Sequence, residues 1–287
     1  MPDKRLHLAR PLGFCGGVRR ALDMFGQLAS TPDARPLYVL HELVHNSTVT
    51  QGMVQAGAHF VSRLEEIPAG AHVFFGAHGV SLATIEAAQA NRLVVHDATC
   101  PLVARNQALA AAECPDLPLI FLGDQSHPEI QGILGHASHR RIFLISGPDE
   151  AKALPPVDEA LFLCQTTLDT RLLAEVLLIL RDRLPMLHDA AQICEAVKPR
   201  QEAVRQLATF CDLLLVLGSR HSANAQTLLK AATGLSAKAL IIQTETELSP
   251  EMLTSVKNLG LASATSTPDN LVDNVIQYLE HAGFHQV

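Results

Sequence analysis

Short hydrophobic runs recur along this chain, and most of them are followed by glycine or by small polar residues. The first, from Lys4 to Arg10, alternates around Leu6 and Leu8, which is typical of a strand. The later runs are almost entirely apolar, which indicates buried strands. They are Leu37–Leu40, Val73–Phe75, Leu93–Val95, Leu119–Leu122, Leu161–Cys164, Leu213–Leu217 and Leu261–Ser263.

The segments between these runs carry apolar residues at helical spacing. The predicted helices are 18–29, 83–90, 102–113, 169–183, 200–209 and 270–280. Strand and helix therefore alternate throughout, which predicts an α/β protein with parallel sheets. Nearly every predicted strand is followed by a histidine, serine, threonine or cysteine, and open α/β sheets bind ligands at that edge.

The sequence Asp97-Ala98-Thr99-Cys100-Pro101 joins one predicted strand to the next helix. Pro101 suits the first helical position, because the N–H that it lacks would have no partner inside the helix. Cys100 would then stand at the carboxyl end of a strand and the amino end of a helix. Unpaired N–H groups at that end lower the pKa of a thiol and prepare it for metal binding or nucleophilic attack.

Two further cysteines repeat this arrangement. Cys15 precedes a predicted helix and is followed by two glycines, which let the backbone approach a bound group closely. Cys194 precedes another predicted helix, and the three cysteines are separated by similar intervals along the chain. We therefore expect three comparable lobes that each present one cysteine to a common centre. The lobes are residues 1–98, 99–192 and 193–287, the last with a C-terminal return segment.

Composition narrows the possible functions. The chain has 287 residues, 48% of them hydrophobic and 18% charged, which is ordinary for a globular protein, and its net charge of −7 does not favour nucleic-acid binding. No apolar run is long enough to span a membrane, and the start lacks the apolar core of a signal peptide. We therefore expect a cytoplasmic protein, in which six reduced cysteines indicate metal binding or catalysis before disulfides.

The wide spacing of the cysteines argues against a zinc ribbon or finger, which needs close pairs. Three converging thiolates can instead hold a cubane iron–sulfur cluster by three of its irons. The fourth iron would then be open to bind substrate as a Lewis acid. Cys114, Cys164 and Cys211 lie in or beside predicted helices and strands, and we expect them to be core residues.

Short polar donors indicate an anion site. They are His45, His78, His127, Ser222, Asn224 and Ser266. Hydroxyls and histidines at helix amino ends suit phosphate or diphosphate, although Ser222 or Ser266 alone would be interpreted as a helix cap. Pro268 indicates that a helix starts just after Ser266. His41 and His45 are spaced like a metal pair on a helix, but the preceding strand end leaves that helix in question.

A carboxyl and a hydroxyl, those of Glu129 and Thr167, form a third feature, because such a pair could pass a proton. Spacing alone leaves a second interpretation open. In it, Glu129 only caps the helix that begins near Ile130.

Taken together, the ordered motifs resemble the LytB family. They are GFCGGV, HELVHN, AHGV, DATCP, HPE, QTT, a cysteine followed by RQEA, GSRHSAN and TSTPD, and they run through almost the whole chain. The resemblance implies a trefoil of three pseudo-equivalent α/β lobes around a central [4Fe-4S] cluster, one per chain. It also implies that Cys15, Cys100 and Cys194 hold this cluster and that one iron is open to substrate.

The activity implied by the resemblance is reduction of 4-hydroxy-3-methylbut-2-enyl diphosphate in the non-mevalonate isoprenoid pathway. Two electrons and two protons remove the allylic hydroxyl as water and give isopentenyl and dimethylallyl diphosphate. Ferredoxin or flavodoxin would deliver the electrons. The six anion-site residues would bind the diphosphate, and Glu129 and Thr167 would lie by the hydroxyl end of the substrate.

Several positions depart from the family pattern. Leu12 stands where an arginine is common, Ala223 where the diphosphate loop usually has a second serine, and Thr265 where a glycine is usual. Losing one hydroxyl should weaken anion binding modestly, since a hydrogen bond to a charged group is worth about 1.5–3 kcal/mol. Glu195-Ala196-Val197 replaces a run of tyrosine or asparagine, alanine and threonine, and the sequence does not explain its negative charge.

Two other interpretations remain open. One is a diverged reductase that has the same three-cysteine cluster and acts on another substrate. The other is a cysteine–histidine transferase or redox sensor that holds no cluster. The colour of anaerobically purified protein separates the second from the rest, because an iron–sulfur protein is brown.

Overall fold

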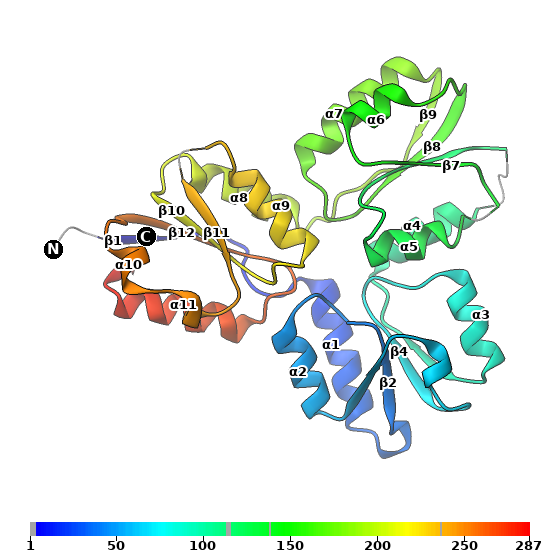
Figure 1. Cartoon of the computed structure of the whole chain (residues 1–287), viewed down its shortest axis with the longest axis horizontal. Coiled ribbons are helices and arrows are strands. Elements are labelled where there is room, and N and C mark those ends of the chain that lie inside the picture. The colour runs from blue at the N-terminus through cyan, green and yellow to red at the C-terminus, as the bar shows by residue number, and fades with distance from the viewer. Residues whose placement is uncertain (1–3, 113–115, 138, 236) are drawn as a thin grey trace. The chain divides into compact units, whose positions relative to one another are not determined.

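The computed structural model describes residues 4–112, 116–137, 139–235 and 237–287. Within these ranges the chain is an α/β protein whose strands form three sheets, and neighbouring strands pair in parallel (Figure 1). The predicted α/β class with parallel sheets is therefore confirmed. Cys114, for which a core position was predicted, lies outside the described ranges.

The chain forms two compact units, which we describe separately. The terminal unit comprises the chain up to Gly16, His45–Val49 and Glu195–Val287. The middle unit comprises Gly17–Val44 and Thr50–Cys194.

The terminal unit contains one sheet, with the strand order β11-β10-β12-β1-β13. Its strands are β1 (Lys4–Leu8), β10 (Leu213–Leu217), β11 (Lys238–Ile242), β12 (Asn258–Ser263) and β13 (Phe284–Gln286). The first strand of the chain thus pairs with strands from the last third and not with the strands that follow it in sequence. Burial explains this, because Leu6 is fully buried in one apolar cluster with Leu259 and Phe284.

Helices cover both faces of this sheet. They are α8 (Lys198–Ala208), α9 (Ala223–Ala232), α10 (Pro250–Leu253) and α11 (Asp269–His281). Alternate residues of β10 point to opposite faces, as a strand requires. Leu215 packs in a cluster with Val275 of α11, whereas Leu214 packs in a cluster with Val204 of α8 and Leu228 of α9.

The middle unit contains two sheets of four strands, with the orders β3-β2-β4-β5 and β7-β6-β8-β9. The first is built from β2 (Leu37–Leu40), β3 (Ala58–Val61), β4 (His72–Phe75) and β5 (Val94–Asp97). The second is built from β6 (Leu119–Leu122), β7 (Ile142–Ile145), β8 (Glu159–Cys164) and β9 (Met186–Asp189). The remaining helices are α1 (Gly16–Ala29), α2 (Ser47–Gln55), α3 (Leu82–Ala90), α4 (Pro101–Ala111), α5 (Pro128–Leu134), α6 (Pro148–Ala153) and α7 (Thr170–Arg183).

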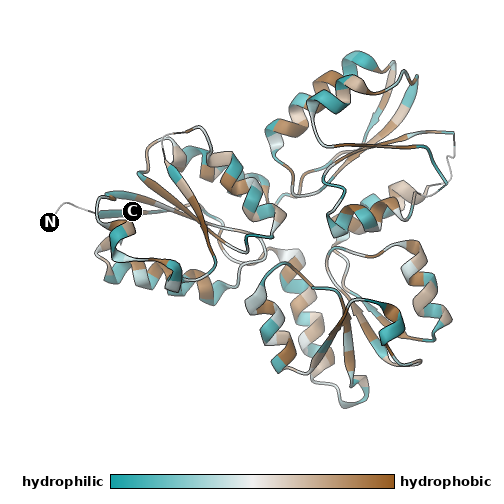
Figure 2. Ribbon diagram, viewed as in Figure 1, coloured by the Kyte–Doolittle hydropathy of each residue, from teal (hydrophilic) through white to brown (hydrophobic). Residues whose placement is uncertain are grey.

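Hydrophobic residues predominate within the strands of each sheet, whereas the helices carry both apolar and polar residues (Figure 2). Phe74 of β4 and Phe121 of β6 are fully buried, as the apolar runs predict. The prediction that 93–95 is a buried strand is wrong for Val94, which is 42% exposed. β5 is the outer strand of its sheet and therefore has a neighbouring strand on one side only. Among the described helices, none is long and apolar enough to cross a membrane.

Candidate active site

Cys100 stands where the sequence predicts, between β5 and α4. It is the N-cap of α4, and Pro101 is the first helical residue. The side chain of Cys100 makes no capping hydrogen bond, so the thiol is not used to close the helix end.

Cys15 ends a tightly held turn that leads into α1. The N–H of Gly13 donates to Ser263 Oγ at 2.8 Å, and the N–H of Phe14 donates to Asp269 Oδ1 at 3.3 Å. Gly13 has a φ of +77°, and a Cβ added there would lie 2.0 Å from Asp269 Oδ1. The turn therefore requires Gly13, two residues before Cys15. The sequence pattern instead indicated a role for the two glycines that follow Cys15.

The backbone N–H of each of the three cysteines donates to a carbonyl in the same relative position. The pairs are Cys15 N–Thr265 O at 3.0 Å, Cys100 N–Ala77 O at 3.0 Å and Cys194 N–Thr166 O at 2.9 Å. Each carbonyl belongs to the second residue after a strand, namely β12, β4 or β8. Each cysteine follows the strand that pairs with it, namely β1, β5 or β9. The three cysteine junctions are thus equivalent in their backbone hydrogen bonding.

Exposure separates these cysteines from the other two that the structure describes. Cys15, Cys100 and Cys194 are half-buried, whereas Cys164 and Cys211 are buried in the core. Burial raises the pKa of Cys164 and of Cys211 to about 12, which keeps both as neutral thiols. The predicted core role of this pair is confirmed.

The chemistry of the donor set suits an iron–sulfur cluster. Cysteine sulfurs are the usual ligands of such clusters, and each of these three side chains is half-buried and not fully enclosed in the core.

Glu129 lies in the first turn of α5 and is only 2% exposed. Its Oε1 accepts the Thr166 N–H at 2.8 Å, and its Oε2 accepts the Thr166 hydroxyl at 2.9 Å. Burial raises the pKa of Glu129 to about 7, and the two hydrogen bonds from Thr166 limit the rise. Such a carboxyl is protonated in part of the molecules at neutral pH and can act as a general acid.

The interpretation of Glu129 as a helix cap is wrong. The N-cap of α5 is His127, whose Nδ1 accepts the Glu129 N–H at 3.2 Å. With Nδ1 as the acceptor, a neutral His127 ring carries its proton on Nε2. The ring of His78 meets that of His127 edge to face, with centroids 5.3 Å apart.

The hydroxyl hydrogen-bonded to Glu129 is that of Thr166 and not that of Thr167, which the sequence had suggested. The Thr167 hydroxyl accepts a hydrogen bond from Gln165 Nε2 at 3.2 Å. Gln165 in turn accepts the Asp124 N–H at 3.2 Å. The two threonines of the QTT sequence therefore have different partners. Thr166 binds the Glu129 carboxyl, and Thr167 accepts a hydrogen bond from Gln165.

In the terminal unit, Ser222 and Asn224 begin α9. Ser222 is its N-cap and accepts the Ala225 N–H at 3.4 Å. Asn224 is 3% exposed, and its Oδ1 accepts the Thr265 N–H at 2.8 Å. Its Nδ2 is buried and finds no hydrogen-bond partner among the described residues. A buried N–H donor without a hydrogen-bond partner is unfavourable in free energy. An anion that accepts a hydrogen bond from Nδ2 would remove this cost.

Ser266 and His45 differ from their sequence interpretations. Ser266 is buried but does not cap α11, whose N-cap is Pro268. The Ser266 carbonyl accepts Asn46 Nδ2 at 3.0 Å. The predicted helical pair of His41 and His45 does not form, because His41 has a φ of 59° and the helix starts only at Ser47.

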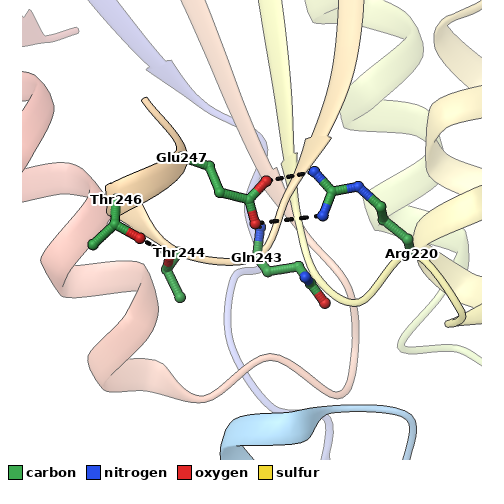
Figure 3. Close-up of polar contacts among 5 residues, drawn as sticks. All are labelled: Arg220, Gln243, Thr244, Thr246 and Glu247. Atoms are coloured by element: carbon green, nitrogen blue, oxygen red, sulfur yellow. Dashed lines mark hydrogen bonds and ion pairs between the residues drawn. The ribbon is translucent and has the colours of Figure 1, made fainter. Parts of the chain in front are cut away.

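An ion pair braces the turn before α9 (Figure 3). Both guanidinium nitrogens of Arg220 face the Glu247 carboxylate, at 3.4 Å for Nη1–Oε1 and 2.5 Å for Nη2–Oε2. Glu247 Oε1 also accepts the Gln243 N–H at 3.1 Å, and Gln226 Nε2 donates to the Arg220 carbonyl at 2.7 Å. The turn is thereby tied to the segment that follows β11.

Glu195, whose negative charge the sequence does not explain, pairs with Lys198. Lys198 Nζ lies 2.6 Å from Glu195 Oε1, three residues further along the chain. Both side chains are exposed, so the pair offsets the added negative charge in solvent and adds little stability.

Comparison with known proteins shows which family this chain matches. The family model described as "LytB protein" matches residues 6–280 of this chain. A "4-hydroxy-3-methylbut-2-enyl diphosphate reductase" of Rhodococcus opacus (strain B4) is 38% identical, covering 99% of this chain and 86% of that protein. The protein of the same name in Haemophilus influenzae (strain PittEE) is 37% identical, covering 99% of this chain and 92% of that protein.

The solved structures that match the fold include two reductases. One is "E-1-hydroxy-2-methyl-but-2-enyl-4-diphosphate reductase from Plasmodium falciparum", with a TM-score of 0.92 and 29% identity, covering 100% of this chain and 92% of that chain. The other is "(E)-4-Hydroxy-3-methyl-but-2-enyl Diphosphate Reductase, the Terminal Enzyme of the Non-Mevalonate Pathway", with a TM-score of 0.68 and 27% identity. It is matched over 98% of this chain and 100% of its own.

Proposed function

The chain belongs to the LytB protein family, and from this premise we propose that it is a 4-hydroxy-3-methylbut-2-enyl diphosphate reductase. The reaction is the last step of the non-mevalonate isoprenoid pathway. The substrate takes up two electrons and two protons and loses its allylic hydroxyl as water. The products are isopentenyl and dimethylallyl diphosphate. The observation that carries the proposal within this chain is Glu129, a buried carboxyl whose pKa is raised to about 7.

Cys15, Cys100 and Cys194 are the ligands that we assign to a [4Fe-4S] cluster. The matching backbone hydrogen bonds at their three junctions and their shared half-burial support this assignment. When bound, such a cluster supplies electrons and an open iron that acts as a Lewis acid. The chain supplies the thiolates, the turns that hold them and the groups that bind and protonate substrate.

The diphosphate is bound by donors that converge on its oxygens in our proposal. The assigned residues are His45, His78, His127, Ser222, Asn224 and Ser266. Asn224 gives the firmest support, because its Nδ2 is buried and finds no partner in the described parts of the chain. His127 presents Nε2–H in its neutral form, since Nδ1 already accepts a backbone N–H.

The proton for the leaving hydroxyl comes from Glu129. Hydroxide is a poor leaving group, and protonation turns it into water. At neutral pH the carboxyl still holds a proton in part of the molecules, because burial disfavours its charge. The Thr166 hydroxyl orients the carboxyl, and Thr167 would bind the hydroxyl end of the substrate.

Electrons would come from ferredoxin or flavodoxin in the cytoplasm, where thiols remain reduced. The cluster is expected to be sensitive to oxygen, because one of its irons lacks a protein ligand.

The test is an anaerobic assay with the purified protein, 4-hydroxy-3-methylbut-2-enyl diphosphate and a strong chemical reductant. We expect brown protein, iron and acid-labile sulfide bound to the chain, and formation of both five-carbon diphosphates. Colourless protein without bound iron after anaerobic purification and reconstitution would overturn the cluster. Brown protein that leaves this substrate unreduced would point to a diverged reductase with another substrate.

A further inference from the structure

Asn106 is a fully buried amide inside α4, the helix that Cys100 caps. Asparagine is disfavoured in a helix interior, and burying its amide is costly unless the amide is hydrogen-bonded. Its Nδ2 donates to the carbonyl of Cys164, the last residue of β8, at 3.3 Å. Its Oδ1 accepts a hydrogen bond from Arg105 Nη1 at 3.3 Å. The amide therefore joins the interior of α4 to the end of β8.

The peptide group between Cys164 and Gln165 is held from two sides. Its N–H, which belongs to Gln165, donates to the Leu122 carbonyl of β6 at 2.9 Å. Its carbonyl, which belongs to Cys164, accepts the hydrogen bond from Asn106. Of these two contacts, only that of Asn106 comes from a side chain. A substitution can therefore remove this contact without altering the main chain.

This peptide group directly precedes Thr166, which holds Glu129. The Thr166 N–H donates to Glu129 Oε1 at 2.8 Å, and the Thr166 hydroxyl donates to Oε2 at 2.9 Å. Both bonds depend on the direction of the main chain at Thr166, because a hydrogen bond weakens steeply when its donor turns away. All of these residues belong to the middle unit. The contacts form one path from Asn106 through the end of β8 to the carboxyl.

We propose that Asn106 is a positioning residue that fixes the end of β8, so that Thr166 holds the Glu129 carboxyl in the orientation from which it donates its proton. This inference rests on the proposed function, because it takes Glu129 as the proton donor. Asn106 acts only through Thr166 and does not touch substrate. When the Asn106 donor is lost, the buried Cys164 carbonyl loses a hydrogen bond, which is costly, and the peptide group should turn.

Two opposing effects set the proton affinity of Glu129. Burial raises its pKa to about 7, and the hydrogen bonds from Thr166 limit the rise. If those bonds lengthen, the ionised carboxylate loses stabilisation and the pKa should increase. Two titratable neighbours belong to this surrounding. The Cys164 thiol stays neutral, because burial raises its pKa to about 12, and His127 accepts the Glu129 N–H through Nδ1.

The experiment compares Asn106→Leu with wild type in full-length protein that is purified anaerobically. Leucine is close to asparagine in size but has no donor. Asn106→Ala also lacks the donor and favours the helix, so it serves if the leucine variant does not fold. Ala110→Gly is the matched control, because Ala110 is fully buried on the same helix. This change loosens the helix without removing a polar side chain.

Two measurements follow the titration of Glu129. The infrared band of its protonated carboxyl, identified by its absence in Glu129→Gln, gives the pKa without substrate. The pH dependence of kcat/KM gives the same pKa from activity. Both measurements are repeated in Thr166→Val and in the double variant with Asn106→Leu, which completes a double-mutant cycle.

We expect both Asn106 variants to titrate about one pH unit higher than wild type, the low end for a lost hydrogen bond to a charged group. At low pH, where the carboxyl is protonated in every variant, kcat should fall by roughly tenfold or more, because the acid is misplaced. The Michaelis constant should stay near wild type. Ala110→Gly should titrate as wild type does. Adding Asn106→Leu to Thr166→Val should shift the titration much less, because the hydroxyl bond is already absent.

A wild-type titration, or a shift to lower pH, in a folded Asn106 variant would overturn the positioning role. Equal shifts with and without the Thr166 hydroxyl would overturn it too, since Asn106 would then act by another path. A shift of the same size in Ala110→Gly would also overturn it, because any loosening of α4 would then suffice. If wild-type protein leaves the diphosphate substrate unreduced, the proposed function fails instead. The infrared titration needs no substrate, so the two failures are distinguishable.

Discussion

Glu129 in the middle unit and Asn224 in the terminal unit are both buried polar side chains in the first turn of a helix, yet their hydrogen bonding is opposite. Both oxygens of Glu129 are occupied by Thr166. Asn224 uses its oxygen on Thr265 but leaves its Nδ2 without a partner among the described residues. One unit therefore holds a carboxyl in place, and the other holds a vacant N–H donor.

The difference assigns different chemistry to the two positions. Internal hydrogen bonds keep Glu129 oriented while burial disfavours its charge, so it is suited to retain and release a proton. An unsatisfied buried donor is suited to receive an acceptor from outside the protein, and a phosphate oxygen is a strong acceptor. The hydrogen bonding of the two side chains thus supports our proposal that Glu129 transfers a proton and that Asn224 binds the anion.

The largest effect should come from the cysteines, because they are the feature that both units share. Cys15, Cys100 or Cys194 replaced by serine should abolish bound iron and turnover, since a hydroxyl is a much poorer iron ligand than a thiolate. Iron analysis and the anaerobic assay measure this. Cys211→Ala is the control and should retain both, because that thiol is buried in the core. Equal loss in all four folded variants would contradict the ligand assignment.

The next largest effect should be on turnover at the occupied carboxyl. Glu129→Gln keeps the shape and can still hydrogen-bond with Thr166, but it removes the acid. Turnover should fall by ~10²–10⁴-fold, the usual contribution of a general acid, while the cluster and the Michaelis constant stay near wild type. Steady-state kinetics with the diphosphate substrate decide this. Nearly normal turnover would mean that the proton comes from another group.

The vacant donor should affect binding more than turnover. Asn224→Asp keeps an oxygen for the Thr265 N–H but replaces the Nδ2 donor with a negatively charged acceptor. Substrate and inorganic diphosphate should bind roughly 10- to 100-fold more weakly, from a lost hydrogen bond to a charged group. Asn91→Asp adds the same charge at an exposed position and should change neither. If Asn224→Asp leaves inhibition by diphosphate unchanged, then Asn224 does not bind the anion, and its contrast with Glu129 has no functional meaning.

The Thr166 hydroxyl should set where activity falls as pH rises. Glu129 must be protonated to act, so kcat/KM should decline above its pKa of about 7. The hydrogen bond from Thr166 Oγ1 stabilises the ionised carboxylate and lowers the pKa. Thr166→Val removes this bond, leaves the backbone bond in place and should move the decline to higher pH. A decline shifted to lower pH in the pH–rate profile would contradict this account.

The parts of the site that sequence could predict are those set by neighbouring residues. The junction at Cys100 follows from an apolar run, a proline and an alanine-rich segment, and the structure has Cys100 as the helix N-cap. The cap role of Ser222 follows in the same way from local pattern. Fold class depends on the same local alternation, which is why it too could be predicted.

The parts that sequence missed depend on residues far apart in the chain. Gly13 is fixed by Ser263 and Asp269, about 250 positions away, and no local pattern reveals that pairing. Thr166 and Thr167 are adjacent and chemically alike, so only the fold decides that Thr166 faces Glu129. The first strand joined the sheet of the last third for the same reason, because burial with β12 and β13 prevailed over chain proximity.

The smallest effect should come from the Arg220–Glu247 ion pair, in the turn before the helix that carries Asn224. Arg220 and Glu247 have side chains that are 52% and 28% exposed, and exposed ion pairs contribute only ~0–1 kcal/mol. Glu247→Gln should therefore raise the Michaelis constant by no more than about fivefold, with turnover unchanged.

High salt should remove even this difference, because salt screens exposed charges. The exchange of both residues, Arg220→Glu with Glu247→Arg, tests whether the pair itself matters, since it restores the ion pair but reverses the charge at position 220, in the turn before α9. If the brace only positions the turn, the exchange should recover most of the loss. If the exchange instead weakens diphosphate binding as much as Asn224→Asp does, then the charge of Arg220 itself attracts the anion. In that case the terminal unit would bind its ligand through an exposed cation as well as through the buried donor.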